Sequence, residues 1–300
     1  MKKLILNRAN LVYVILLAVV LFLPARISVD VPWAFLIMLL LSEILFLAQY
    51  AKSQKKSAVD VAFIAYIFLA AWEIFTKLGF GHPVLMPPLE NVFNVFISQW
   101  QLILQGIGSS LLLLVIGVGS ALIIGILAGL LVGWIPRLRE AVMPIANVIS
   151  PIPPLVYTPY VVAVMPTFRA ASIFIVFSAV VWPTFQAMVS RVQNMDQRII
   201  QSAKVMNVTT GTMLFKVILP YCLPGIISGL STSMRAAFLC LTGAELLGAR
   251  SGLGFFVKKF SDYADYTKVI AGIIVMGIVV TLIELGIKQL EKKCIKWRYN

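Results

Sequence analysis

Long apolar runs, each close to the length of a membrane-spanning helix, recur from one end of this chain to the other. A helix needs about 20 consecutive apolar residues to cross the hydrocarbon core of a bilayer. Runs of roughly that length occupy residues 11–24, 31–50, 59–76, 107–134, 141–165, 171–188, 223–247 and 269–287. The chain is also 60% hydrophobic and only 12% charged, far from the composition of a soluble domain. We therefore expect an all-α, polytopic membrane helix bundle with about eight transmembrane helices.

The distribution of basic residues predicts the orientation of the bundle. Of the 25 lysines and arginines, seventeen fall on the side of the N-terminus, seven fall on the opposite side, and Arg235 lies within a span. Cytoplasmic loops are enriched in Lys and Arg, so both termini and a polar segment at residues 201–220 are expected in the cytoplasm. Attraction to anionic lipid headgroups explains the remaining excess of positive charge. We therefore expect a bilayer as partner and no nucleic acid.

The first apolar run is similar to a secretion signal only in outline. Lys2 and Lys3 precede it, but it ends in Pro24-Ala25-Arg26 with no small-x-small cleavage site. We therefore expect it to remain as the first span.

The cysteines fall in or beside spans or in the basic tail, which favours packing residues and reduced thiols over a disulfide framework or a metal site. They are Cys222, Cys240 and Cys294.

Residues 201–220 form a polar insert between two apolar runs. The pattern predicts a short amphipathic helix, a turn at Thr209-Thr210-Gly211, a second short helix and a stop at Pro220. Asn207 is expected to take a left-handed conformation at tolerable cost. Two apolar faces outside the lipid need a partner, either the chain's own spans or a groove on a soluble protein. The faces comprise Ile199, Ile200, Ala203 and Met206, and Met213, Leu214 and Val217.

This segment resembles the EAA loop of ABC-importer permeases, in which Glu-Ala-Ala is followed by a spaced glycine and by Ile-x-Leu-Pro. Here Gln201-Ser202-Ala203, Asn207 and Ile218-Leu219-Pro220 stand in those places. Gln201 replaces the acid and Asn207 the glycine. In the family this loop docks into a groove on the cytoplasmic ATPase. The resemblance thus implies a coupling loop made of Gln201, Ser202, Ala203, Asn207, Gly211, Ile218, Leu219 and Pro220.

The resemblance covers about 240 residues from Asp60 onward and is to the permeases of the nitrate, sulfonate, taurine and bicarbonate importer group. The family core has six spans. The resemblance therefore implies a type I ABC-importer permease core at residues 59–300 and an extra N-terminal transmembrane hairpin at residues 1–58. One departure is that Ser231 follows Gly229-Leu230 where the family has arginine, and Arg235 comes four residues later. The matching stretches are Trp72-Glu73-Ile74, Leu85-Met86-Pro87-Pro88, Ser109-Ser110-Leu111, Ser150-Pro151-Ile152-Pro153-Pro154-Leu155, Ala244-Glu245-Leu246-Leu247 and Ser251-Gly252-Leu253-Gly254.

Glycines and prolines mark two features of the core. Gly125, Gly129 and Gly133 recur every four residues, which predicts close approach by a neighbouring helix. The proline-rich stretch at residues 150–155 must break a helix, because proline lacks a backbone donor and disfavours helix at the preceding residue. Irregular backbone at membrane depth is tolerated against protein or a water-lined cavity. Packing kinks and a role in the pathway or its gating are both open for Pro151, Pro153 and Pro154.

Charged residues inside predicted spans each cost roughly 2.5–3.5 kcal/mol near the bilayer centre. Glu43 is expected to face the bundle, while Glu73 and Glu284 fall near span ends, where headgroup solvation is available, and are expected to be structural. Arg235 and Glu245 are ten residues, or about 15 Å, apart on one helix. They cannot pair, so Arg235 needs another partner or a wet cavity, while Glu245 lies at the external end. Both are candidates for lining the pathway, with a structural role as the alternative.

The resemblance implies a permease subunit of an ATP-driven importer in the cell membrane of a prokaryote. Two copies would form the pathway, a pair of cytoplasmic ABC ATPase subunits would hydrolyse ATP, and an extracytoplasmic binding protein would deliver the substrate. The implied substrate is a small anion such as a sulfonate, taurine, nitrate or bicarbonate. Importers of a thiamine precursor or riboflavin are an alternative within the family. No cofactor is implied.

Two other classes of function are weighed against this interpretation. An enzyme is disfavoured, because the only histidine is His82 and the sequence has neither a phosphate-binding glycine loop nor metal-ligand spacing. We therefore expect no catalytic residue. A stand-alone secondary transporter is the second alternative. Such transporters often show internal repeats with interrupted helices, and no repeat is evident here.

Overall fold

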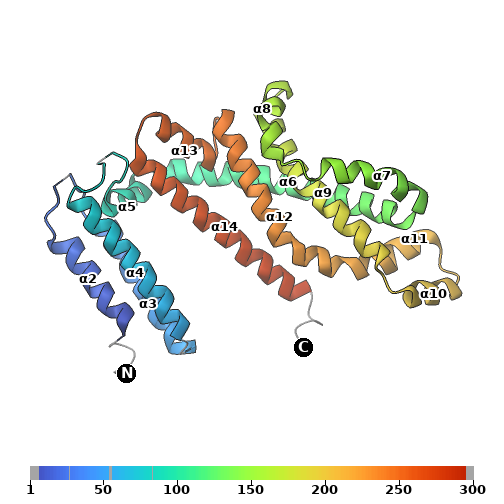
Figure 1. Ribbon diagram of the computed structural model, residues 1–300, viewed down its shortest axis with the longest axis horizontal. Helices are drawn as coiled ribbons and strands as arrows, with labels where there is room; N and C mark the ends of the chain where they lie inside the picture. Colours follow the sequence, from blue (N-terminus) through green and yellow to red (C-terminus); the bar gives the residue numbers. More distant parts are fainter. Residues whose placement is uncertain (1–6, 27, 54–55, 83, 295–300) are drawn as a thin grey trace. The chain divides into compact units, whose positions relative to one another are not determined.

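The computed structural model describes residues 7–26, 28–53, 56–82 and 84–294. Lys2, Lys3 and the side chain of Cys294 lie outside this description. Within these ranges the regular structure is entirely helical (Figure 1), which confirms the expected fold class. The chain divides into two compact units, residues 1–103 with 257–274 and residues 104–256 with 275–300, which we call the first and second units.

Six of the described helices are long and apolar enough to cross a membrane. The expected span at residues 141–165 comprises α7 (Pro136–Ile149) and α8 (Pro154–Val164), which meet at a bend of 91° and form either one broken span or a re-entrant loop. Residues 11–24 correspond to α2 (Arg8–Phe22), which at 15 residues is shorter than the usual spanning length. The long helices are α3 (Trp33–Ser53), α4 (Lys56–Lys77), α6 (Trp100–Trp134), α9 (Phe168–Gln193), α12 (Leu219–Gly248) and α14 (Tyr266–Cys294).

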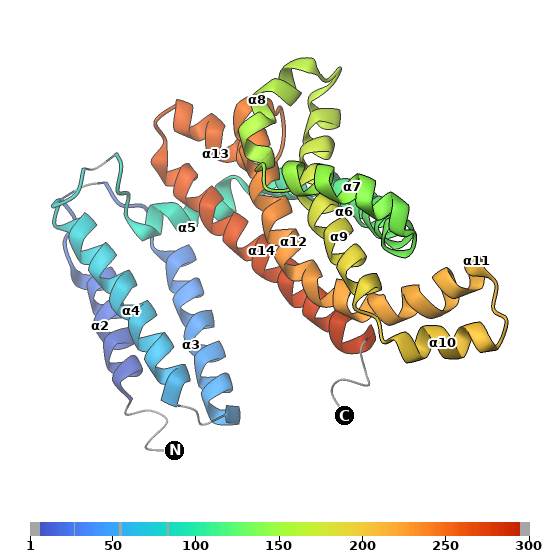
Figure 2. The same ribbon diagram turned by 45° about the vertical axis from the view of Figure 1, so that its right-hand side comes forward.

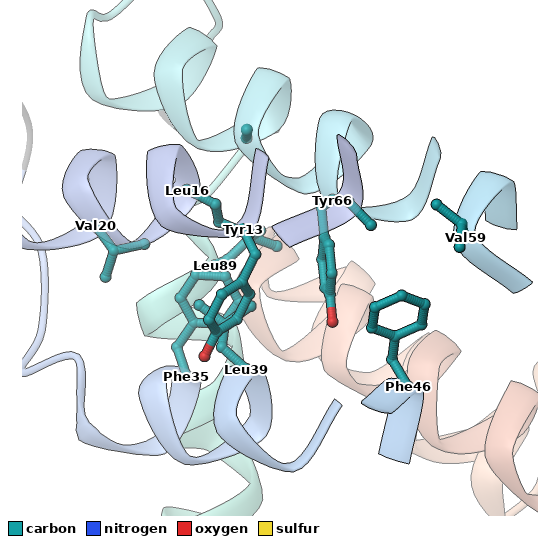
Figure 3. Packing of buried hydrophobic residues seen from close by; sticks show 11 residues of the cluster. Tyr13, Leu16, Val20, Phe35, Leu39, Phe46, Val59, Tyr66 and Leu89 are labelled. Carbon is teal, nitrogen blue, oxygen red and sulfur yellow. The ribbon is translucent and has the colours of Figure 1, made fainter. Parts of the chain in front are cut away.

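The core of the first unit joins α2, α3, α4 and the short α5 (Leu89–Ser98) (Figures 1 and 2). Figure 3 shows how side chains of α2 and α3 meet those of α4, with the rings of Tyr13 and Tyr66 5.3 Å apart. Tyr66 also donates a hydrogen bond to Glu43, with 3.0 Å between Oη and Oε2. The N-terminal hairpin therefore packs on α4 across the expected boundary at residue 58, and Glu43 has a polar partner.

A buried charge cluster closes one end of this unit. The ammonium of Lys77 lies 2.8 Å from Glu90 Oε1 and 3.4 Å from Glu73 Oε1, and it donates to the carbonyl of Val20 at 2.9 Å. Glu73 also accepts from the backbone N–H of Leu89 at 3.1 Å. Its side chain is 0% exposed, so these partners, and not headgroups, surround the carboxylate near the end of α4. The ends of α2 and α5 cover it, a contact that the local sequence does not reveal.

In the second unit α6 packs closely on α9 through its glycines. A Cβ on Gly129 would lie 2.7 Å from Cβ of Met188, and one on Gly133 would lie 2.8 Å from Cβ of Val192. Gly125 faces the carbonyl oxygen of Val181 at 3.0 Å in the same construction. No side chain fits at these points without displacing α9. The prediction that this glycine stripe brings two helices together is confirmed.

The helix α12 packs along α9 and α8 in this unit. It begins at Leu219, at the end of the 201–220 segment, and ends before α13 (Leu253–Asp262). Figure 2 shows α10 (Gln197–Val205) and α11 (Thr210–Thr212), the helices of that segment, lying beside each other. The helix α12 therefore connects this segment to α13.

Candidate functional site

The first half of the 201–220 segment is the expected amphipathic helix. It is α10 (Gln197–Val205), and Asp196 caps it by accepting a hydrogen bond from the N–H of Arg198 at 2.9 Å. A side-chain oxygen at this position satisfies an N–H that has no partner within the helix. The helix ends where Asn207 takes a φ of 55°. The expected left-handed residue is confirmed, and it reverses the chain at this point.

The turn lies earlier than its predicted position. Thr210–Thr212 is already helical as α11, and Thr209 caps it by accepting from the N–H of Thr212 at 3.4 Å. The prediction of a turn at Thr209-Thr210-Gly211 is therefore wrong, because Thr209 acts as a cap and the reversal occurs around Asn207. Gly211 lies exposed in the first turn of the new helix.

The second half does not stop at Pro220. A π-helical turn at Met213–Ile218 leads directly into α12, in which Pro220 occupies the first turn. Proline is tolerated there because N–H groups of the first turn have no partner within a helix. Single π turns inside α-helices are often found at functional sites. The expected separate second helix is therefore wrong, because residues 210–218 continue directly into α12.

The apolar faces of the segment pack on the chain itself. Ala203 is 8% exposed and lies in one cluster with Met213, Leu214 and Ile218. Residues of α6 and α9 complete this cluster, among them Leu130 and Met188. Of the two partners left open by the sequence, the chain's own helices thus cover most of the second face and part of the first, whereas Ile199 and Met206 stay exposed. Ala203 and Ile218 are parts of this packing, and neither offers a surface to another protein.

The segment also carries a second, exposed apolar surface, in which Met206 belongs to a predicted face while Val205 and Phe215 do not. Val205 and Met206 are 88% and 79% exposed, and Phe215 is 52% exposed. Gln201, Ser202, Asn207 and Pro220 are exposed beside them, while Leu219 is half-buried. The signal available in the sequence was that Val205 and Phe215 are apolar but lie outside the predicted apolar faces. We call Val205, Met206, Asn207 and Phe215 the tip surface.

The proline-rich stretch breaks the helix as predicted. Pro153 precedes α8, Pro154 occupies its first position, and Pro151 and Pro153 are exposed. The break is held from α9, because Ser150 Oγ donates to Gln186 Oε1 at 3.0 Å and Gln186 Nε2 donates to Asn147 Oδ1 at 3.1 Å. These hydrogen bonds fix α7 against α9 at the bend. A pathway role for the prolines stays a prediction.

Glu245 anchors the other end of α12. Its buried carboxylate accepts hydrogen bonds from Ser110 Oγ and from the N–H of Gly254, both at 2.7 Å. Ser110 Oγ in turn accepts from the N–H of Leu253 at 2.9 Å. Gly252 has a φ of +126°, and a Cβ there would collide with the Glu245 carboxylate. Glu245 thus ties α6 and the start of α13 to α12, and Ser110, which belongs to one of the matching stretches, is its partner.

Arg235 and Glu245 lie apart, as expected from their spacing, and Arg235 pairs with Glu284 of α14. Both Nε and Nη2 of Arg235 donate to the Glu284 carboxylate, the latter at 2.9 Å. The Glu284 side chain is 19% exposed. The expectation that headgroups solvate Glu284 is therefore replaced by an ion pair with α12.

Arg191, near the end of α9, lines two cavities of about 460 and 210 Å³. Its guanidinium donates to the carbonyl of Gly225 in α12, and a Cβ at Gly225 would strike it. Tyr221 and Pro224 line the larger cavity, and Thr232 and Ser233 line the smaller one. This contact joins segments distant in sequence, so the sequence pattern does not reveal it.

Comparisons with known proteins agree with this architecture. Residues 121–296 match the family model described as "Binding-protein-dependent transport system inner membrane component". The taurine transport system permease protein TauC of Escherichia coli is 27% identical over 238 residues, which cover 77% of this chain and 86% of the relative. The putative aliphatic sulfonates transport permease protein SsuC of Bacillus subtilis is 27% identical over 241 residues, covering 77% of this chain and 85% of the relative.

A nitrate import permease protein, NrtB of Leptolyngbya laminosa, is 27% identical over 238 residues, covering 75% of this chain and 83% of the relative. Among solved structures, a chain of the MetNI methionine ABC transporter in an inward-facing conformation aligns with a TM-score of 0.56 at 19% identity. The alignment covers 66% of this chain and 98% of that one, which shows a shared fold. This chain belongs to the family of binding-protein-dependent transport system inner membrane components and is the permease subunit of an ABC importer.

Proposed function

We propose that two copies of this chain form the pathway of an importer for a small anion, with both termini and the 201–220 segments in the cytoplasm. Each segment contacts one subunit of an ABC ATPase pair, and an extracytoplasmic binding protein delivers the substrate. The relatives named for taurine, aliphatic sulfonate and nitrate transport support the anion class.

The observation that carries the coupling assignment is the division of the 201–220 segment into two surfaces. One is buried against α6 and α9, which makes the segment a rigid part of the permease. The other is the tip surface, whose Val205 and Met206 are the most exposed large apolar side chains of the segment. Exposed apolar surface of this kind marks contact sites for other proteins. The tip surface therefore fits the groove of a soluble ATPase.

Rigidity suits this role mechanically. Because α11, the π turn and α12 are continuous, displacement of the tip surface moves α12 as a body. ATP binding favours the closed ATPase pair and draws the two tip surfaces together, which reorients the second unit in alternating access. The nucleotide can shift this equilibrium only by its differential affinity for the two states. Glu245, at the far end of α12, transmits that movement to α6 and α13.

We assign residues 1–58 to a peripheral hairpin and residues 59–300 to the permease core. The hairpin contacts α4 and α5 through an apolar cluster, which supports a flanking position. Its single mid-span acid, Glu43, is already engaged by Tyr66. The hairpin therefore stabilises the assembled subunit without contributing to the pathway.

Reconstitution tests the proposal. The chain is purified with the ATPase and binding protein encoded by neighbouring genes and placed in liposomes loaded with ATP. We expect ATP-dependent uptake of at least one of taurine, ethanesulfonate, nitrate and bicarbonate, and native mass spectrometry should show two permease and two ATPase subunits. Uptake driven by an ion gradient without the ATPase would instead identify a secondary transporter.

A further inference from the structure

Arg235 presents a charged fork in the middle of a membrane-spanning helix. It lies near the centre of α12, and its side chain is 60% exposed. Two of its nitrogens engage Glu284 of α14. Paired N–H donors of a guanidinium match the oxygens of a carboxylate or a similar oxyanion. The pair is therefore both a link between helices and a preformed binding geometry for an anion.

A second polar contact repeats this link at heptad spacing. Ser228 Oγ donates to Glu291 Oε1 at 2.8 Å. Ser228 and Arg235 are seven residues apart on α12, as Glu284 and Glu291 are on α14. Seven residues make about two turns, so each pair lies on one face of its helix. The facing sides of α12 and α14 thus carry a polar seam.

This seam cannot face lipid. Charged side chains in membrane spans face the bundle interior or a water-filled cavity, and they mark substrate pathways. The Arg235 guanidinium is paired with Glu284, yet most of its side chain remains uncovered by its own subunit. Hydrocarbon cannot satisfy the remaining N–H groups, whereas water in a pathway can.

Glu284 has a second basic residue near it in the sequence. Lys288 lies four residues further along α14, on the same face of the helix. A glutamate four residues before a lysine is the favourable orientation for a pair on one helix. The Glu284 carboxylate therefore has two alternatives, Arg235 across the seam and Lys288 on its own helix.

We propose that Arg235 is an anion-binding residue of the transport pathway and that Glu284 occupies its fork until a substrate oxyanion replaces it. The displaced carboxylate turns to Lys288, which releases α14 from α12 at this level. The inference rests on the importer function proposed above and names its substrate class: anions with two or more exposed oxygens, such as sulfonates, carboxylates, nitrate or bicarbonate. A solute without such a group cannot compete with Glu284.

The test compares Arg235→Gln and Glu284→Gln in the reconstituted complex, with Lys258→Gln as control. Lys258 belongs to an exposed ion pair with Asp262 outside the candidate spans. The probes are labelled taurine, ethanesulfonate, nitrate and bicarbonate. Hydrogen bonds to a charged group contribute strongly to binding, so loss of the guanidinium donors in Arg235→Gln should raise KM by about tenfold or more. Glu284→Gln should lower KM by removing the internal competitor, and Lys258→Gln should leave it unchanged.

A purely structural bridge behaves differently. It would lose assembly equally in both variants, and the exchange Arg235→Glu with Glu284→Arg would restore wild-type KM. Our inference expects the exchange to restore assembly while KM stays raised, so this double variant decides the case if single variants fail to fold. Wild-type KM in Arg235→Gln, with the parent complex importing a probe, overturns the inference alone. If the parent complex imports none of the probes, the proposed anion class fails as well.

Discussion

Lys77 is the residue whose surroundings differ most from its place in the sequence. Its place in the sequence puts it among the basic residues of the external side, yet it is 2% exposed. Its ammonium faces two carboxylates and the end of α2. A buried ion is stable only with well-placed partners. Lys77 therefore holds the hairpin to α4 and α5, and a count of charges by segment cannot reveal this.

Replacing Lys77 by methionine should destabilise the first unit strongly. The substitution leaves the Glu73 and Glu90 carboxylates buried without a counter-charge, a change that typically costs about 3–5 kcal/mol. Thermal unfolding in detergent, followed by tryptophan fluorescence, measures the loss. The control is Lys52→Met, which removes an exposed charge from the same unit and should change the midpoint little. Equal midpoints for the two variants would contradict the role given to Lys77.

At the scale of elements, the contact between α6 and α9 depends on the absence of side chains. A Cβ at Gly129 would meet both Met188 and the carbonyl oxygen of Phe185 within 2.8 Å, whereas Gly119 has nothing within 4 Å. Gly129→Ala should therefore lower the stability of the second unit by about 1–3 kcal/mol through overpacking. Gly119→Ala should be neutral or gain about 0.5–1 kcal/mol. Chemical denaturation of both variants measures the difference, and similar values for the two would refute close packing at Gly129.

The segment that includes α10 gives a second prediction at this scale. Ala203 is buried within its own subunit, while the adjacent Ser202 is exposed. Ala203→Glu should expose α10 and the π turn to solvent, because an unpaired buried carboxylate is costly. Ser202→Glu should leave both intact. Hydrogen exchange over residues 197–218 reports the outcome, and unchanged protection in Ala203→Glu would mean that this residue is not part of the internal packing.

Across the whole molecule, the features that could be predicted are those set by local periodicity and by proline. The long spans, the break before Pro154, the glycine stripe and the φ of Asn207 all follow from short stretches of sequence. The burial of Glu73, the continuity of Met213–Ile218 with α12, and the partner of Arg235 do not. These depend on segments distant in sequence or on competition between caps and turns, which no local pattern records.

Topology is the prediction that belongs to the whole molecule. We expect Ser57 in the cytoplasm and Tyr263 outside, because of the distribution of basic residues. Both positions are accessible, Tyr263 at 74% exposure. Single cysteines at these positions, in a chain whose native cysteines have been replaced, are treated in intact cells with a membrane-impermeant maleimide. We expect the maleimide to label Tyr263→Cys and not Ser57→Cys. Labelling of Ser57→Cys would contradict the predicted orientation.

If the tip surface couples the permease to the ATPase, the closure of the ATPase pair on ATP binding must act through this surface. Met206 is 79% exposed, so Met206→Asp places a charge in the proposed ATPase contact without disturbing the internal packing. The measurement is recovery of the ATPase with tagged permease, normalised to permease that retains the wild-type unfolding midpoint. We predict loss of most of the ATPase together with uptake. Wild-type recovery and transport by Met206→Asp would show that coupling does not pass through this surface.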